Sequence, residues 1–174
     1  MFVIVCDIDE TLCDSGERRK KVVKKYGTEE KWTDECVNEF LDPEAIRKDK
    51  VIPGAENIVE IAKACGKLVI LTGRNERSRL ETRKWLKKNL KIGEKIPLIM
   101  RNNEDFRGPM ECKEDLFVRY VLGDYVGAKF AFFDDDPRLF NTFMKYGIVF
   151  KSPEIWEFLD ALMTFSYDSG LVHE

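Results

Sequence analysis

Five short runs of consecutive apolar residues recur along the chain, separated by longer stretches with helical periodicity. The apolar runs fall at residues 2–6, 67–71, 97–100, 129–133 and 148–150. The helical patterns fall at residues 54–65, 76–90, 112–122, 137–146 and 153–165. Runs that are apolar on both faces are typical of buried parallel strands. Because they alternate with helices, the pattern predicts an α/β fold in which helices cover both faces of one parallel sheet.

Residues 14–52 interrupt this alternation. They contain two helical stretches, the basic Arg18–Lys25 and then Lys31–Leu41, before the first core helix is expected to begin near Pro53. We therefore predict a small helical cap over residues 14–52, inserted into a core made of residues 1–13 and 53–174. At 174 residues the chain is long enough for one well-packed domain and too short for two of ordinary size.

Two carboxylates directly follow the first apolar run. Asp7 and Asp9 lie just past residues 2–6, where the carboxyl end of a parallel strand opens onto the crevice in which α/β sheets bind ligands. Carboxylates this close repel each other, so a cation must lie between them or one of them must hold a proton. Both conditions suit phosphoryl transfer. The alternative is a strand followed by an acidic Asx turn.

A second acidic cluster follows a later strand. Asp134, Asp135 and Asp136 come directly after the apolar run at 129–133. A single acid would cap the following helix, but three adjacent acids exceed what capping needs and repel each other unless a divalent cation is present. The second cluster therefore favours a metal site over the Asx-turn interpretation of the first.

Groups that can hold a phosphate lie between the two acidic clusters. Thr72, Gly73 and Arg74 follow the run at 67–71 and offer a hydroxyl, an open backbone and a guanidinium fork to phosphate oxygens. Lys113 begins the next amphipathic stretch and would add a compact positive charge. A lone lysine is more typical of a solvated helix face, so Lys113 is a candidate phosphate-binding residue only because the other motifs are present.

Taken in chain order, these elements resemble the four motifs of the haloacid dehalogenase superfamily of aspartate-nucleophile phosphohydrolases. The matching positions are Asp7, Asp9 and Thr11 in the first motif, Thr72 in the second, Lys113 in the third, and Asp134 with Asp135 in the fourth. The resemblance implies a Rossmann-like three-layer α/β/α fold with a small cap after the first strand. One departure is Glu10, where the commonest family residue is glycine.

Within that superfamily the chain is similar to the 3′-phosphatase domain of bacteriophage polynucleotide kinase over roughly residues 1–150. The matching segments are Thr72–Arg74, Thr82–Leu86, Pro97–Met100, Lys113–Phe117 and Asp134–Asp135. By position, Arg18 and Arg74 match arginines near the phosphate site of that domain, while Pro109 replaces an aspartate. The Gly-rich loop of a kinase domain, ending in Gly-Lys-Ser/Thr, is not in the sequence.

The resemblance implies a covalent mechanism. Asp7 would attack phosphorus and become an aspartyl phosphate, while Asp9, kept protonated by repulsion, would protonate the leaving oxygen and later activate water. The candidate ligands are all oxygens, so Mg²⁺ is the expected cofactor. It would be held by Asp7, the backbone carbonyl of Asp9, Asp134 and Asp135, while Thr72 and Lys113 would hold phosphoryl oxygens. The expected substrate-binding residues are Thr11, Arg18, Gly73 and Arg74.

The charge of the chain does not decide which substrate the protein binds. The net charge of −3 and pI near 5.5 give no global signal for nucleic-acid binding. Two basic runs, Arg18–Lys25 and Arg77–Lys88, are either solvated helix faces or the walls of a groove that leads to Asp7. The favoured substrate is the phosphorylated 3′ end of a nucleic acid. The alternatives are a small nucleotide or sugar phosphate and, from another class, a non-catalytic phosphate-binding module.

Cysteine and histidine usage narrows the chemistry further. The five cysteines form no Cys-x-x-Cys pair, so neither a disulfide framework nor a zinc site is indicated. The sole histidine is His173. This count excludes catalytic triads with histidine and zinc sites with histidine ligands, unless the tail folds back. No signal peptide or membrane-spanning stretch is visible, and we expect a cytoplasmic protein.

Overall fold

The sheet that positions the rest of the molecule is parallel and five-stranded. A computed structural model of the chain describes residues 1–28, 32–105 and 107–152. The strands lie in the order β5 (Leu98–Arg101), β4 (Gly66–Asn75), β1 (Phe2–Cys6), β6 (Lys129–Asp134) and β7 (Gly147–Lys151). All four neighbouring pairs are parallel. The predicted α/β fold is confirmed.

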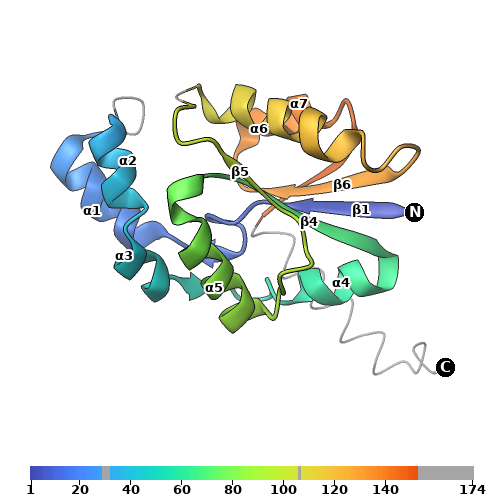
Figure 1. The fold of residues 1–174 in the computed structure, drawn as a ribbon, viewed down its shortest axis with the longest axis horizontal. Helices are drawn as coiled ribbons and strands as arrows, with labels where there is room; N and C mark the ends of the chain where they lie inside the picture. The colour runs from blue at the N-terminus through green and yellow to red at the C-terminus, as the bar shows by residue number, and fades with distance from the viewer. Residues whose placement is uncertain (29–31, 106, 153–174) are drawn as a thin grey trace.

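Helices cover both faces of this sheet, as Figure 1 shows. One face carries α4 (Asn57–Cys65) and α5 (Arg79–Leu90), preceded by the 3₁₀ turn η2 (Glu76–Ser78). The other carries α6 (Pro109–Phe117), continued by the π-helical turn η3 (Val118–Leu122), and α7 (Pro137–Phe143). The helix expected at 153–165 lies outside the described residues. No helix of the described ranges is long and apolar enough to cross a membrane.

Strand β1 shows why its sequence is apolar throughout. Ile4 and Cys6 belong to the hydrophobic core on the α4 and α5 side, whereas Val3 and Val5 belong to the core on the α6 and α7 side. Successive side chains of a strand point to opposite faces, so a central strand covered on both faces needs apolar residues at every position. The two cores meet at β1 and hold its carboxyl end in the middle of the sheet edge.

Strand β4 runs further than its hydrophobic pattern predicts. The apolar run ends at Leu71, but the strand continues to Asn75. Its pairing with β5 shifts register between Thr72 and Asn75, after which Asn75 pairs with Arg101. Because the extension consists of Gly73 and three buried polar residues, Thr72, Arg74 and Asn75, hydrophobicity alone could not reveal it. The extension carries polar side chains past the end of β1.

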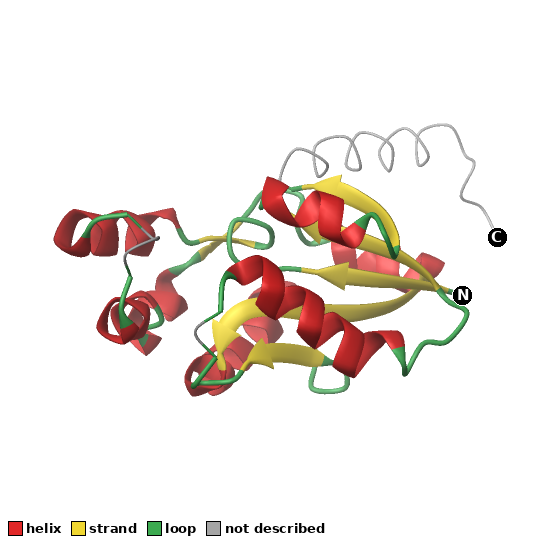
Figure 2. Cartoon of the chain, turned by 90° about the horizontal axis from the view of Figure 1, so that it is seen from above, coloured by secondary structure: helices red, strands yellow, loops and turns green. Residues whose placement is uncertain are grey.

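We call residues 14–52 the cap segment. It contains α1 (Gly16–Tyr26), α2 (Asp34–Phe40) and α3 (Pro43–Lys48), which gather at one end of the molecule in Figures 1 and 2. A two-stranded antiparallel sheet, β2 (Cys13–Asp14) with β3 (Lys50–Val51), joins its two ends. Helix α3 packs against α5 of the core. The cap segment therefore stands beside the carboxyl edge of the main sheet, where Asp7 and Asp9 lie.

Candidate active site

Four separate elements deliver polar side chains to the carboxyl edge of the sheet. Asp7 follows β1, Thr72 lies near the end of β4, Asp134 ends β6, and Lys113 lies on α6. The backbone N–H of Asp7 still donates to the carbonyl of Phe133 at 2.9 Å, so β1 and β6 stay in register up to the acids. Parallel strands place their carboxyl ends together, which is why residues distant in sequence meet here.

Lys113 lies between two of these acids. Its Nζ is 2.9 Å from Oδ2 of Asp7 and 2.8 Å from Oδ2 of Asp134, and all three residues are buried. Burial alone would lower the pKa of Lys113, but Asp134 and Asp7 outweigh it and raise that pKa. Helix α6 begins at Pro109, one turn before Lys113. The structure therefore brings this predicted lysine to the predicted acids.

The three acids Asp7, Asp134 and Asp135 form a cluster that one lysine cannot neutralise. Each offers a carboxylate oxygen, and these oxygens lie within 4.8 Å of one another. Burial raises the pKa of Asp7 to about 8, Lys113 opposes this rise, and Asp134 adds to it. Burial, followed by the charge of Asp134, raises the pKa of Asp135 to about 6. Such crowding of oxygen ligands fits a divalent cation.

The two oxygens of Asp7 have different surroundings. Oδ2 contacts the lysine, whereas Oδ1 is buried and has no hydrogen-bond partner within the described ranges. A buried carboxylate oxygen without a partner is costly, so such atoms are rare in folded proteins. The exception at Asp7 lies at the strand end, where a metal ion or an electrophilic phosphorus could approach.

Asp9 does not join this cluster through its side chain. Arg74 binds it with two hydrogen bonds, Nε to Oδ2 at 2.9 Å and Nη2 to Oδ1 at 2.7 Å, and Arg18 donates to the same Oδ1. Burial would raise the pKa of Asp9, but Arg74 and then Arg18 outweigh it and hold that pKa well below its ordinary value. The expectation that repulsion from Asp7 keeps Asp9 protonated is therefore contradicted in this arrangement.

Asp49 is a member of this second group that the sequence did not indicate. It lies at the end of α3 and accepts from Nε of Arg18 at 3.0 Å and from Nη2 of Arg74 at 3.2 Å. Two guanidiniums thus meet two carboxylates, Asp9 and Asp49, with charges that cancel. We call these four residues the arginine–aspartate quartet. Asp49 belongs to no motif and is 40 positions from Asp9, so no local signal could have identified it.

We expect Asp49→Asn to lower kcat about tenfold while changing KM little, because Arg18 and Arg74 would then pull on Asp9 alone. A steady-state assay with an aryl phosphate measures both constants. Glu44→Gln is the matched control, since Glu44 pairs with an exposed arginine on the same helix α3. Equal kcat values for the two variants would contradict a role for Asp49 in holding the arginines.

The remaining predicted residues lie around the strand ends. Thr72 is buried, and its Oγ1 accepts from the backbone N–H of Arg74 at 3.3 Å, while a Cβ at Gly73 would meet no atom within 4 Å. Thr11 is also buried, and its carbonyl accepts from the hydroxyl of Ser152 at 3.2 Å. Direct contact of these residues with a substrate stays a prediction.

Glu10 adopts the left-handed backbone conformation, with φ of 56°. This region favours glycine, the commoner family residue at this position. The Glu10 carboxylate accepts from the hydroxyl of Ser15 at 2.6 Å and from its backbone N–H at 3.1 Å. These bonds offset the strain, and the first motif keeps its turn.

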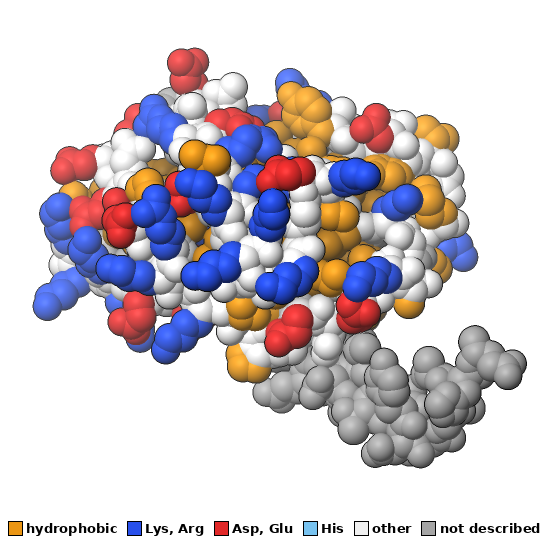
Figure 3. Space-filling model, turned by 60° about the horizontal axis from the view of Figure 1, so that its bottom comes forward, with side chains coloured by type: hydrophobic (Ala, Val, Ile, Leu, Met, Phe, Trp, Pro, Cys, Tyr) orange, Lys and Arg blue, Asp and Glu red, His pale blue; other side chains and the backbone are white. Residues whose placement is uncertain are grey.

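Basic residues of the two runs form many ion pairs with neighbouring acids. On α1, Lys20 pairs with Glu17, and Lys21 and Lys25 both pair with Glu39. The run on α5 includes further pairs of the same kind, Arg79 with Glu76 and Lys84 with Glu81. Figure 3 shows lysine and arginine side chains spread across one face with acids among them. A groove that leads from these runs to Asp7 stays a prediction.

Comparison with known proteins places this site in context. A family model described as polynucleotide kinase PNKP phosphatase domain matches residues 2–150. No curated protein matches the chain.

Among solved structures, the chain is similar to one described as a Pnkp1/Rnl/Hen1 complex, with a TM-score of 0.63, 21% identity, and coverage of 86% of this chain and 45% of that one. A haloacid dehalogenase-like hydrolase from Streptococcus pneumoniae gives a TM-score of 0.57 at 15% identity, with 84% and 81% covered. A hydrolase from Pseudomonas syringae gives 0.56 at 16% identity, with 94% and 99% covered. At these sequence identities, the structural similarities show that the chain shares the fold of these proteins. The chain spans less than half the length of the Pnkp1 complex chain.

Proposed function

We propose, from the premise that the chain belongs to the family of polynucleotide kinase PNKP phosphatase domains, that it removes 3′-phosphates from polynucleotide ends through an aspartyl-phosphate intermediate. Its membership makes it a phosphatase of the haloacid dehalogenase superfamily, as the sequence resemblance predicted. A neighbouring structure is described as an RNA repair complex, which supports a nucleic-acid substrate.

One observation carries the chemistry, namely the unequal surroundings of the two Asp7 oxygens. Lys113 holds Oδ2, while Oδ1 is left without a hydrogen-bond partner in the part of the chain that the structure describes. An oxygen oriented in this way is suited to attack phosphorus. In our proposal Oδ1 forms a bond to phosphorus while the bond to the leaving oxygen breaks. Water then attacks the aspartyl phosphate and releases inorganic phosphate.

Asp9 is the proposed proton carrier for both steps. It lies two residues after Asp7 and would give its proton to the leaving oxygen, then take one from the attacking water. Because Arg74 and Arg18 stabilise its ionised form, the substrate complex must loosen this pairing before Asp9 can carry a proton. Lys113 and Thr72 would stabilise the charge that develops on the transferring phosphoryl group.

Mg²⁺ is the proposed cofactor, because the cluster of Asp7, Asp134 and Asp135 offers oxygen ligands only and carries more negative charge than Lys113 balances. When bound, the metal would supply charge stabilisation on the phosphoryl oxygens. The side chain of Asp9 is committed to the arginines, and a ligand role for its backbone carbonyl stays part of the proposal. The cap segment, residues 14–52, would limit which substrates reach this edge.

A small phosphate ester is the second candidate substrate. The mixed surface favours it, since three of the α1 lysines are already paired with acids and the net charge is −3. The two candidates differ in how far the protein reaches along the substrate, because only a polymer offers phosphates beyond the one that is cleaved.

We expect a 3′-phosphorylated oligonucleotide, RNA or DNA, to have a higher kcat/KM than a 3′-mononucleotide, with a specificity constant that falls steeply with salt. The reason is that each additional phosphate contact displaces counterions. Phosphate release should be measured for both substrates from low to high salt. Replacing Lys20, Lys21, Lys24 and Lys25 by alanine should weaken the oligonucleotide reaction selectively.

A matched control removes four exposed lysines from the opposite, amino-terminal edge of the sheet. These are Lys67, Lys91, Lys95 and Lys129. The control changes the net charge equally but should leave the salt slope of the oligonucleotide reaction intact. If both quadruple variants behave alike, or if the two substrates share one salt slope, the small-molecule phosphatase becomes the better assignment.

A further inference from the structure

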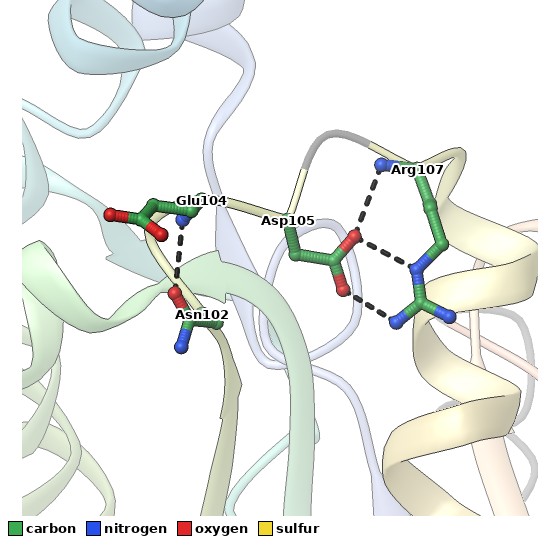
Figure 4. A pocket seen from close by; sticks show the side chains of 4 residues that line it. All are labelled: Asn102, Glu104, Asp105 and Arg107. Carbon is green, nitrogen blue, oxygen red and sulfur yellow. Dashed lines mark hydrogen bonds and ion pairs between the residues drawn. The ribbon is translucent and has the colours of Figure 1, made fainter.

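A polar hollow lies beside the proposed phosphate site, between α2 of the cap segment and the carboxyl ends of β4 and β5. It has two adjoining parts that share Asn102 and Asp105. The larger part, of about 590 Å³, is wide open to solvent. The narrower part, of about 40 Å³, is the one that Gly73, Asn75 and Arg101 line. In Figure 4 the residues of the larger part gather on the loop that follows β5, between the ribbon of the cap segment and α6.

The floor of this hollow contains a cross-strand pair with unmet hydrogen bonds. Asn75 at the end of β4 pairs in register with Arg101 at the end of β5, and both line the hollow. Asn75 is 6% exposed, and neither its Oδ1 nor the Nε of Arg101 has a hydrogen-bond partner within the described ranges. Both atoms are themselves buried. A buried acceptor on β4 and a buried donor on the neighbouring β5 thus both lack partners, which is rare in folded proteins.

The hollow adjoins the phosphate-holding end of the same strand. Gly73, which directly follows Thr72, lines it, and no atom lies within 4 Å of where a Cβ on Gly73 would be. Asn75 is only two residues further along β4. A molecule that places its phosphate at Thr72 would therefore extend its remaining part over Gly73 towards Asn75.

The lining is balanced in charge and rich in amides. Three acids face three arginines, namely Asp34, Glu104 and Asp105 against Arg77, Arg101 and Arg107. Several are already paired, as Figure 4 shows for Asp105 and Arg107, whose side chains are 2.7 Å apart. Further amide groups come from the asparagines at positions 38, 102 and 103. A subsite for additional phosphates would carry an excess of positive charge, so this lining suits a neutral group with several hydrogen-bonding atoms.

We propose that this hollow binds the nucleoside that carries the scissile phosphate, with Asn75 accepting a hydrogen bond from it and Arg101 donating one. The edges of nucleobases present adjacent donors and acceptors, which is the pattern that the Asn75–Arg101 pair complements. Arg77 donates to the side-chain oxygen of Asn38 on α2 at 2.8 Å, so the cap segment forms one wall. The inference rests on the proposed phosphatase chemistry and specifies which part of the substrate is recognised.

The test compares two phosphate esters, thymidine 3′-monophosphate and p-nitrophenyl phosphate, which has no nucleoside. We expect Asn75→Ala to lower kcat/KM for the nucleotide at least tenfold more than for the aryl ester, chiefly through KM. Arg101→Lys keeps the charge but removes Nε and should act in the same direction. Asn141→Ala, an exposed asparagine on α7, is the matched control and should change neither constant. Equal losses for both esters would overturn the proposal.

A second measurement does not depend on turnover. In the Asp7→Asn background, thymidine 3′-monophosphate binding by calorimetry should weaken at least tenfold on adding Asn75→Ala or Arg101→Lys, while binding of inorganic phosphate should not. If Asn75→Ala fails to fold, Arg101→Lys decides alone. Unchanged nucleotide affinity would reject the nucleoside site. Wild-type protein that hydrolyses both esters equally would reject it too but leave the phosphatase standing, whereas no release from either ester would reject the proposed function itself.

Discussion

Replacing Asp7 by asparagine is expected to lower phosphate release by a factor on the order of 10⁴ or more while the fold is kept, because an amide cannot form the aspartyl phosphate. The side chain keeps its size, and the contact between its Oδ2 position and Lys113 can persist as a hydrogen bond. Activity is measured by release of inorganic phosphate from a 3′-phosphorylated oligonucleotide, and folding by circular dichroism. Turnover within tenfold of wild type, with contaminating phosphatase excluded, would reject the covalent mechanism.

Two further variants show whether the loss is specific. Asp124→Asn removes an exposed acid from the turn after η3 and should leave the rate unchanged. Asp9→Asn should allow slow formation of the phosphoenzyme, which can be trapped and detected by its mass, because Asp7 is still present to attack. If Asp7→Asn also traps a phosphoenzyme, the nucleophile is another residue.

Removing divalent cations is expected to abolish activity, and adding Mg²⁺ or Mn²⁺ should restore it. Asp7, Asp134 and Asp135 bring three carboxylates together against one lysine, so without a cation they repel each other and the transferring phosphate. Ca²⁺ should inhibit, because its larger and looser coordination shell disturbs the in-line geometry. The assay is phosphate release after exhaustive chelation and then metal titration. Full activity in chelator would exclude the metal site.

Thermal unfolding gives a readout of the metal that does not depend on catalysis. The pKa of Asp7 is raised to about 8 in the folded protein, so between its ordinary value and about pH 8 the folded state binds more protons than the unfolded state. The metal-free protein should therefore lose stability as pH rises through this window. Mg²⁺ should raise Tm in wild type most at the upper end of the window. Asp7→Asn should raise the metal-free Tm and reduce the response to Mg²⁺.

The fold could be predicted where burial is uniform. Strands β1 and β6 are apolar on both faces, so their sequences allow one placement in a parallel sheet, and their predicted bounds agree with the structure to within one residue. The end of β4 could not be predicted, because the strand continues through Arg74 and Asn75, whose burial depends on β5 and the cap segment. Hydrophobic pattern identifies strands that end in apolar residues and misses those that continue as buried polar ones.

The candidate site likewise contains residues that could be predicted from the sequence and residues that could not. Asp7, Lys113 and Asp134 come together as predicted, because each is fixed by the strand or helix that carries it. The predicted protonation of Asp9 was wrong, because Arg74 and Arg18 stabilise its ionised form. Arg18 and Arg74 were expected at the phosphate, but here both bind Asp9. Long-range pairing of this kind follows from how the cap segment docks, which local sequence does not specify.

The arginine–aspartate quartet spans the boundary between two parts of the chain, since Arg18 lies on α1 of the cap segment and Arg74 on β4 of the core. An outward swing of α1 would remove one guanidinium from Asp9 and thereby raise its affinity for a proton. Closing again would restore the second guanidinium and favour release of that proton. A substrate phosphate that drew Arg18 away from Asp9 would thus also favour protonation of the acid, and return of Arg18 would favour proton delivery to the departing alcohol.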